Sequence, residues 1–395
     1  MKQIRGIAIL LFLAFILSST AQLSEKFPMV PGIPVVHSPK SSGAFLGTPS
    51  IVKLKNGDFL YSHDFFGPSV KKDIVHIYRS VDKGKTWTFQ AEIRDAFWCG
   101  MFVAGVDVYL LGVNGASRNL AIWKSKDNGK TWSTPSILRH DRCHGSSTPV
   151  VVANGRIYKG YDHLGDEVTK KWMSDNRSFI MSARIDSDLM NPESWSYTNE
   201  VTKPADMDGT GWLETNAVLS KNGKIMGITR IANESGLIAG YYELASDTVI
   251  DSQSVGSINF IGGATKFNVK WDEKTQLYWS LTNYPPDVLR KPKMRAGGMR
   301  SVLSLISSPD LNNWKINAIV LASEDVTYHG FQYVDWLFDG KDIVFASRTG
   351  YDDGLGGAEN AHNSNFMTFH RIKNYVKAKT PKKYQYLLVK TKDKK

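Results

Sequence analysis

Two octapeptides, Ser80-Val-Asp-Lys-Gly-Lys-Thr-Trp87 and Ser125-Lys-Asp-Asn-Gly-Lys-Thr-Trp132, share the form S-x-D-x-G-x-T-W and decide the fold. Such a segment suits a hairpin turn, because the Asp accepts hydrogen bonds from turn N–H groups and the Gly takes a positive φ. The Trp that ends each copy is expected to pack between neighbouring sheets. Weaker copies occur at Ser308–Trp314 and Asp188–Trp195. The repeat predicts a fold built from several similar small sheets.

A second repeat precedes these turns and consists of an alternating strand, a hairpin turn and another strand. Residues 49–61 show it most clearly, with an Asn-Gly turn at 56–57. Related segments are residues 101–112, 149–158, 216–228, 265–281 and 332–346. Six units of roughly four strands can be counted, and the length also accommodates seven units of about 50 residues. With no long amphipathic helix and no linker of biased composition, the sequence predicts an all-β, single-domain β-propeller over residues 22–375.

The net charge is concentrated at the two ends of the chain. Lys and Arg exceed Asp and Glu by 49 to 38, and residues 1–21 hold two of the excess positive charges while residues 376–395 hold seven. The body between them is close to neutral, so it lacks the basic surface that nucleic-acid binding needs. We therefore expect no nucleic-acid partner. The Lys-rich tail, residues 376–395, is expected to be a solvated end, with its apolar patch Tyr384–Val389 forming a last strand or packing on the surface.

The first 21 residues have the features of a secretory signal peptide. Two basic residues precede the apolar run Ile7–Leu17, and small residues occupy the cleavage site at 19–21. A run of this length is too short to span a bilayer. We expect a secreted or periplasmic monomer with no membrane insertion. Cys99 and Cys143 could form a disulfide in an oxidising compartment, but we favour two separate buried thiols.

Polar residues near the expected mouth of the central channel are the first candidates for a site. His63 leaves a strand into a Gly-Pro loop, where it would act as a general acid or base or serve as a structural histidine. His144 ends the polar stretch Arg139–His144. We place this stretch in a loop near the channel and not at a metal site, because no helix aligns its histidines.

Cationic residues on or after the inner strands form the second set of candidates: Arg230, Lys266 and Arg348. Together they would suit a carboxylate-bearing sugar, because arginine binds a carboxylate through two parallel hydrogen bonds. Separately, each would be an ordinary surface ion pair. The last unit adds Tyr333 among dense polar and aromatic residues, a mixture found in carbohydrate pockets and in blade-stabilising networks alike.

The expected partner is an acidic oligo- or polysaccharide. Phosphate-binding glycine loops, a nucleophile elbow and zinc-ligand spacings are absent from the sequence. We therefore expect no cofactor and no metal.

The repeated turns resemble the Asp boxes of sialidase-like β-propellers. A wider set of motifs, including Gly47-Thr-Pro-Ser-Ile51 and Ser62-His-Asp-Phe-Phe-Gly-Pro68, resembles the secreted propellers of glycoside hydrolase family 145. The other matching segments are residues 56–58, 212–218, 262–267, 278–283, 329–336 and 365–371. This resemblance covers nearly all of residues 45–375.

The resemblance to family 145 implies a seven-bladed propeller, and on this ground we favour seven blades over the six that can be counted. It also implies an exo-acting α-L-rhamnosidase that removes rhamnose linked α-1,4 to glucuronic acid in plant arabinogalactan-type glycans. The position that matches the family's catalytic histidine is His63, on the face opposite the usual propeller pocket. Some relatives carry Gln there and are not expected to hydrolyse. Ordinary glycosidases use two carboxylates; Asp64 and Glu214 are candidates, and the sequence assigns no pair.

Three other functions stay open. The fold also resembles polysaccharide lyases that cleave rhamnose–uronate linkages by β-elimination, which needs a base and a cation beside the carboxylate. The residues of suitable type for that reaction are His144, Arg230, Tyr333 and Arg348. Sialidase activity is the second alternative, although Pro31-Gly-Ile-Pro34 lacks the arginine of the Phe/Tyr-Arg-Ile-Pro motif. A non-catalytic glycan-binding propeller is the third.

Overall fold

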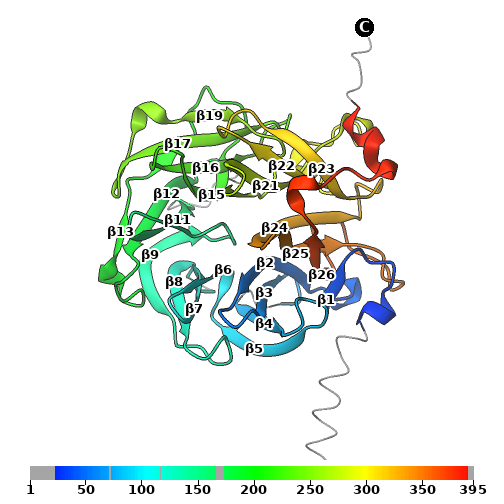
Figure 1. Ribbon diagram of the computed structural model, residues 1–395, viewed down its shortest axis with the longest axis horizontal. Helices are drawn as coiled ribbons and strands as arrows, with labels where there is room; N and C mark the ends of the chain where they lie inside the picture. The colour runs from blue at the N-terminus through cyan, green and yellow to red at the C-terminus, as the bar shows by residue number, and fades with distance from the viewer. Residues whose placement is uncertain (1–22, 71–72, 116, 166–172, 390–395) are drawn as a thin grey trace, which may run out of the picture.

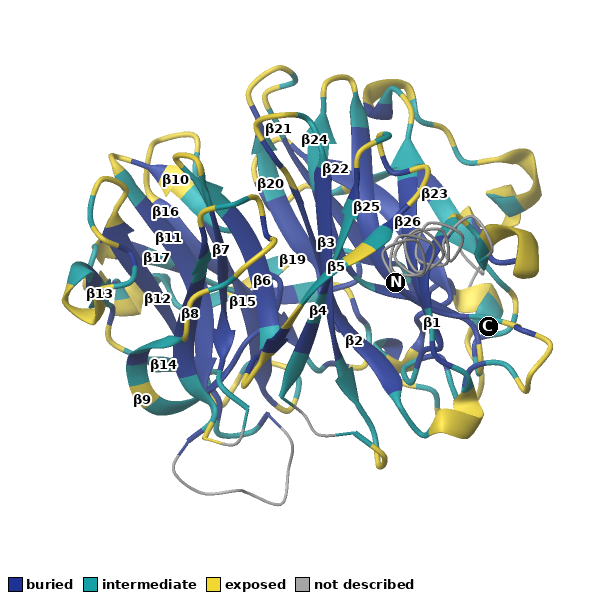
Figure 2. Cartoon of the chain, turned by 90° about the horizontal axis from the view of Figure 1, so that it is seen from below, coloured by how far each residue is buried: buried dark blue, intermediate teal, exposed yellow. Residues whose placement is uncertain are grey.

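The computed structural model describes residues 23–389 except 71–72, 116 and 166–172. Its strands form antiparallel sheets arranged in a ring around a central axis (Figure 1). The strands are largely buried, and the exposed residues gather in the turns at the two ends of the ring (Figure 2). The predicted all-β propeller is confirmed. The predicted signal peptide lies outside the described residues, within which no helix has the length and apolarity needed to cross a bilayer.

Each unit of the ring is a small sheet whose strands mostly follow one another in sequence. Unit 1 contains β2 (Phe45–Lys53), β3 (Phe59–Phe66), β4 (Ile74–Ser80) and β5 (Thr88–Arg94). Unit 2 contains β6 (Phe97–Ala104), β7 (Asp107–Val113), β8 (Asn119–Ser125) and β9 (Ser136–His144). Unit 3 contains β10 (Val151–Ala153), β11 (Arg156–His163), β12 (Arg177–Arg184), β13 (Trp195–Tyr197) and β14 (Val201–Thr202).

The second half of the ring repeats this plan. Unit 4 contains β15 (Trp212–Leu219), β16 (Ile225–Ile231), β17 (Ile238–Ser246), β18 (Val249–Ile250) and β19 (Gly256–Asn259). Unit 5 contains β20 (Asn268–Asp272), β21 (Leu277–Asn283), β22 (Val302–Ser308) and β23 (Lys315–Ala322). Unit 6 contains β24 (Gly330–Asp339), β25 (Asp342–Gly350), β26 (Phe366–Ile372) and the N-terminal strand β1 (Ile33–His37).

Short 3-10 helices lie in the connections and in the tail. They are η1 (Lys40–Ser42), η2 (Pro192–Ser194), η3 (Ser252–Ser254), η4 (Asp287–Leu289), η5 (Ala296–Gly298), η6 (Tyr375–Lys377) and η7 (Lys382–Leu388).

The described residues form six such units, as the hairpin repeat indicated, and not the seven that the family resemblance implied. Units 2 and 3 are hydrogen-bonded into one nine-stranded sheet. They meet only through β9 and β11, where Asp162 pairs with His144 and His163 pairs with Cys143. This short bridge joins two neighbouring units and adds no further unit to the ring.

Six hydrophobic clusters of buried residues hold the ring together, one at each contact between neighbouring units. The cluster between units 6 and 1 contains Val36, Leu46, Trp87, Val344 and Phe369. Because the last unit packs on the first in the same way as the others pack on their neighbours, the ring is closed. Closed stacking leaves each sheet with only short outer edges.

The two octapeptides form the turns that their sequence predicted. Asp82 accepts hydrogen bonds from the Thr86 N–H at 2.9 Å and the Thr86 hydroxyl at 2.6 Å. Gly84 has a φ of +88°, and its carbonyl accepts a hydrogen bond from the fully buried Trp87 indole. The second copy repeats this arrangement around Asp127. Because each turn joins the last two strands of its unit, the Asp boxes lie at the end of the ring opposite to the start of the inner strands.

The ring is closed by the N-terminal strand, and the C-terminal tail packs on the outside. β1 pairs antiparallel with β26, so unit 6 contains both ends of the propeller. The patch Tyr384–Val389 does not form a strand: most of it lies in η7, where Leu387 is fully buried against Val302 and Ile319. Cys99 and Cys143 are both buried free thiols, as we favoured.

Candidate active site

Four inner strands carry a β-bulge near their beginning. The bulges interrupt the pairing of β2 with β3, β6 with β7, β15 with β16 and β24 with β25. At each one a residue other than glycine has a positive φ: Thr48 at 38°, Trp98 at 52°, Glu214 at 62° and Tyr333 at 52°. A bulge turns a side chain away from the regular alternation of the strand, and strained backbone of this kind collects at functional sites.

All four bulged residues line the same cavity of about 420 Å³. The cavity lies on the axis, at the end of the ring where the inner strands begin. Its volume is within the range of small-molecule sites. Its other lining residues are Gly47, Asp64, Phe66, Phe97, His144, Gly145, Ser146, Leu213, Arg230, Arg300, Arg348 and His362. The bulges thus direct side chains from four units into one pocket.

Three arginines reach this cavity from three different units or loops. The first, Arg230, donates through Nε to the Ala264 carbonyl at 3.0 Å. Arg300 donates through Nε to the Gly297 carbonyl at 3.0 Å, and Arg348 donates to the carbonyl of His362 at 2.9 Å. Each guanidinium is therefore held in place by backbone.

Two of these arginines also keep one terminal nitrogen without a hydrogen-bond partner among the described residues: Nη2 of Arg230 and Nη1 of Arg348. Arg300 is further held by the side chains of Gln332 and Tyr333. Because all three arginines line the cavity, an anionic ligand there would satisfy the two free nitrogens.

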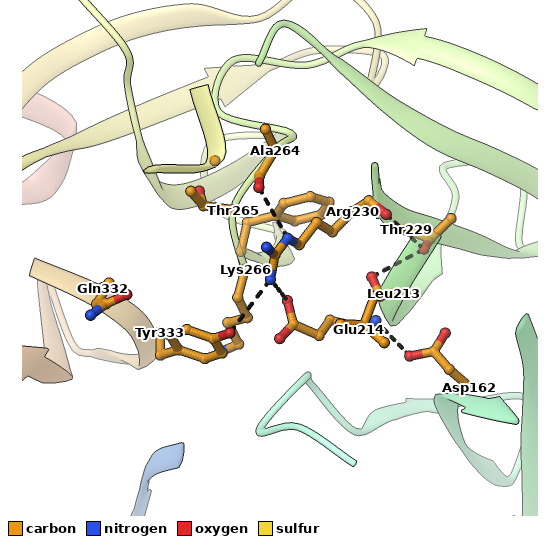
Figure 3. A network of polar contacts seen from close by, with 12 residues as sticks. Asp162, Leu213, Glu214, Thr229, Arg230, Ala264, Thr265, Lys266, Gln332 and Tyr333 are labelled. Carbon is orange, nitrogen blue, oxygen red and sulfur yellow. Dashed lines mark hydrogen bonds and ion pairs between the residues drawn. The ribbon is translucent and has the colours of Figure 1, made fainter. Parts of the chain in front are cut away.

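Glu214, Arg230 and Tyr333 form a chain of contacts across the cavity floor (Figure 3). The Glu214 carboxylate accepts a hydrogen bond from Arg230 Nη1 at 3.0 Å, and the same nitrogen lies 3.5 Å from the Tyr333 hydroxyl. Burial would raise the pKa of Glu214, but Arg230 and His144 outweigh it and the pKa is lowered. The Glu214 side chain is therefore an ionised carboxylate in the cavity wall, with its Oε1 atom unpartnered among the described residues.

Asp64 lines the same cavity, and its pKa is raised, whereas that of Glu214 is lowered. Its side chain is buried, and burial raises the pKa of this carboxyl to about 6, although the Trp98 N–H donates to Oδ2 at 2.8 Å. Oδ1 has no partner among the described residues. A Cβ atom at Gly47 would lie 2.2 Å from Oδ1, so only glycine leaves room for this carboxyl. The cavity thus holds two carboxyl groups whose pKa values are shifted in opposite directions.

The two cavity histidines are neutral near pH 7. Burial lowers the pKa of His144 to about 4, and its ring lies 4.1 Å from the Trp98 ring. Burial, reinforced by Arg348, lowers the pKa of His362 to about 2. Both rings are therefore uncharged near pH 7, and each is a weaker base than a solvent-exposed imidazole.

The structure brings together four of the five residues that the sequence indicated for substrate binding: His144, Arg230, Tyr333 and Arg348. The exception is Lys266, which is 2% exposed and does not line the cavity. Its ammonium donates to the Val334 carbonyl at 2.7 Å and to the Ser147 carbonyl at 3.2 Å, behind the cavity wall. The third cation in the cavity is Arg300, which the sequence analysis did not single out, because it follows a long loop and belongs to no hairpin motif.

His63 is not at this cavity. Its side chain is fully buried and packs on the rings of Phe65, His76 and Tyr78. Its Nδ1 atom lies 3.1 Å from the Asp64 carbonyl oxygen. Burial lowers the pKa of His63 to about 3. It does not line this cavity, and its catalytic role, which the family resemblance implied, stays a prediction.

The stretch Arg139–His144 is part of strand β9 and not a loop. Nearby, Asp141, His163 and Glu200 have side-chain oxygens and nitrogens within 4.8 Å of one another. Arg139 forms ion pairs with both Asp141 and Glu200, so this group is an ion-pair network on the strand.

No protein-family model matches the sequence, and no curated protein matches it either. Solved structures do resemble the fold. An α-L-arabinanase of Penicillium chrysogenum is 14% identical with a TM-score of 0.55, over 87% of this chain and 98% of that one. The α-L-arabinofuranosidase of Fusarium graminearum, of glycoside hydrolase family 93, is 12% identical with a TM-score of 0.54, over 86% and 96%.

A sialidase of Trypanosoma rangeli is 15% identical with a TM-score of 0.55, over 86% of this chain and 55% of the sialidase chain. At such identities the likeness shows the fold alone. Membership of family 145 stays a prediction. The fold is that of a β-propeller, as in these three structures.

Proposed function

We propose that this protein is a glycoside hydrolase that cleaves a glycosidic bond directly beside a carboxylate in an acidic glycan. The observation that carries the proposal is the convergence of three arginines, two of them with a free donor nitrogen, on a cavity that also holds Asp64 and Glu214. The fold agrees with it, because the similar solved structures bear the names of an arabinanase, an arabinofuranosidase and a sialidase.

The charge of the cavity favours an anionic ligand. Three guanidinium groups face it, and Glu214 is the one carboxylate there that is ionised well below neutral pH. Buried charge without a partner is unfavourable, so a ligand carboxylate would complete the balance. The arginines also surround Tyr333: Arg300 and Arg348 lie 5.5 and 4.7 Å from its ring centroid. The bound carboxylate would therefore lie close to the Tyr333 hydroxyl.

The two carboxyl groups suit an acid and a base. A carboxyl with a raised pKa can remain protonated and serve as general acid, while one with a lowered pKa remains charged and can accept a proton. In this assignment Asp64 gives its proton to the leaving oxygen. Tyr333 attacks the anomeric carbon, as a tyrosine does in sialidases, and the Glu214 carboxylate accepts the proton of the Tyr333 hydroxyl. Water then attacks the anomeric carbon of the Tyr333-bound sugar and gives a proton to Asp64, while the departing Tyr333 oxygen takes its proton back from Glu214.

Two linkages have a carboxylate in the required place. In rhamnose α-1,4-linked to glucuronic acid, the carboxylate is on the ring carbon next to the one that carries the scissile oxygen. In a sialoside, it is on the anomeric carbon itself. The sequence motifs favour the rhamnosyl linkage, and we propose exo-acting α-L-rhamnosidase activity on arabinogalactan-type glycans as the first activity to test. His63 has no part in this mechanism.

The test is product analysis with purified protein. It is incubated with rhamnosyl-glucuronate oligosaccharides, with sialyllactose and with a rhamnose–uronate polymer. Release of free rhamnose or free sialic acid would support hydrolysis and name the linkage. Tyr333→Phe should reduce the rate by 10³-fold or more, on the order seen when a nucleophile is removed. Tyr351→Phe, outside the cavity, is the matched control. Release of neither sugar would refute the proposal.

A lyase is the second candidate, because the neutral His144 lies in the same cavity as the arginines. It could remove the proton beside the carboxylate while an arginine neutralises that carboxylate and Tyr333 protonates the leaving oxygen. The same incubation separates the two reactions, since elimination leaves an unsaturated uronate that absorbs ultraviolet light and hydrolysis does not.

A further inference from the structure

The loop between β21 and β22 carries a dense run of positive charge outside the cavity. Within six residues it holds Arg290, Lys291, Lys293 and Arg295, and it then continues to Arg300 in the cavity. The four side chains line an open groove of about 610 Å³ together with Asp287 and Glu234. We call this the basic groove. Because the loop follows the end of β21, the basic groove lies at the cavity end of the ring.

Direct contacts connect the basic groove to the cavity wall. The Lys291 ammonium donates to the Thr327 hydroxyl at 2.8 Å. The carbonyl of Thr327 accepts a hydrogen bond from the Ala361 N–H at 2.7 Å. The next residue, His362, lines the cavity. At the other end of the loop, Arg300 is held by the Gly297 carbonyl. A chain of contacts therefore links one side of the groove to the cavity-lining His362, and the loop that lines the groove continues to the cavity-lining Arg300.

The groove has an excess of positive charge that its own carboxylates do not neutralise. Four cationic side chains face two carboxylates. The pair between Arg295 and Glu234 spans 3.0 Å, but the two side chains are 72% and 69% exposed, so it is weak and open to competition. A comparable groove beside the second Asp box balances two lysines with two aspartates. Because the propeller body as a whole is nearly neutral, this excess of positive charge is a feature of the basic groove and not of the whole surface.

An exposed aromatic residue is the sequence neighbour of Thr327, which Lys291 contacts. Tyr328 follows Thr327 directly and is 49% exposed. An exposed aromatic ring beside cations is suited to a carbohydrate whose ring stacks on it while its carboxylates meet the lysines.

We propose that the basic groove is a subsite for further carboxylate-bearing residues of the glycan, beyond the bond that is cleaved. This inference rests on the proposed function in taking the substrate as an acidic glycan. It adds that the substrate is a polyanionic chain and not a single acidic sugar. Binding in the groove would anchor the chain while its end occupies the cavity.

The experiment measures binding of polygalacturonate by affinity electrophoresis, with free glucuronate as the short ligand. The Tyr333→Phe variant is used so that no cleavage occurs. In that background, Lys291→Glu with Lys293→Glu should weaken polymer binding by about tenfold or more, and should leave glucuronate binding unchanged. Lys83→Glu with Lys85→Glu makes the same change of charge at the first Asp box, at the opposite end, and should leave both unchanged.

Equal loss of polymer binding in the two double variants would overturn the inference, because it would show that only net charge matters. Unchanged binding in the Lys291/Lys293 variant would overturn it as well. These results are distinct from a failure of the proposed function, since the assay needs no turnover. A protein that binds polymer through the groove but releases no product would refute hydrolysis and leave the subsite standing.

Discussion

Replacing Asp64 by asparagine should stabilise the protein at neutral pH and abolish its activity. Burial moves the pKa of Asp64 from 3.8 to about 6. The folded protein therefore holds this proton more tightly than the unfolded chain, and stability declines as the pH rises from about 4 to about 6. A shift of two pKa units corresponds to about 3 kcal/mol. Asparagine is never charged, so Asp64→Asn removes that penalty at pH 8 and gains nothing at pH 3.

Urea unfolding of the two proteins at pH 3.5 and pH 8 measures this effect. We expect the variant to be more stable by about 1 to 3 kcal/mol at pH 8, the lower figure allowing for imperfect replacement of the hydrogen bond from Trp98. Turnover of the wild type should fall as the pH rises through about 6, where Asp64 loses its proton. A stability difference that is the same at both pH values, or an active variant, would refute the assignment of Asp64 as a buried general acid.

Three further substitutions test other parts of the structure. His63→Ala should change the turnover rate by no more than about twofold relative to the wild type. It should lower the free energy of unfolding in urea by about 2–4 kcal/mol, because it removes a buried ring. A variant that folds normally but has lost turnover would support a catalytic role for His63. Lys266→Met should lower kcat by about tenfold with little change in KM, because the Lys266 ammonium holds the carbonyl of Val334, the residue after Tyr333. Steady-state kinetics measures both constants. A change in KM alone would contradict this positioning role. Asp82→Ala should lower the free energy of unfolding in urea by about 1–2 kcal/mol, because the turn loses the hydrogen bonds of this carboxylate. The turnover rate should not change. An unchanged urea midpoint would show that the first Asp box does not stabilise the ring.

The sequence predicted the repeating architecture because the signals for it are local. The Asp, Gly and Trp of each octapeptide act within one turn, and the Asn-Gly hairpins pair neighbouring strands. The number of units was harder to predict. Six units could be counted from the hairpins, but the family resemblance led us to favour seven, whereas the described residues form six.

The site was predictable only in part, because its geometry depends on contacts between units. Arg230 and Arg348 were recognisable from their place on inner strands. Lys266 also lies next to an inner strand, but its ammonium donates to the carbonyls of Ser147 and Val334 and does not line the cavity. Arg300 reaches the cavity from a loop of irregular structure. The bulges at Glu214 and Tyr333 also leave no pattern in the alternation that sequence analysis could detect.

The pairing of β1 with β26 has a consequence for the order of folding. β1 is the first described strand to be synthesised, and its partner is the last. The ring therefore cannot close until the whole propeller has emerged. Pairing of the two strands also brings together the ends of a long segment, which lowers the conformational entropy of the chain. Until β26 has been made, β1 has no partner strand, and another chain could add to its unpaired edge. High contact order of this kind slows folding, so completion of unit 6 is expected to be the late step at which the nascent protein is most exposed to misassembly.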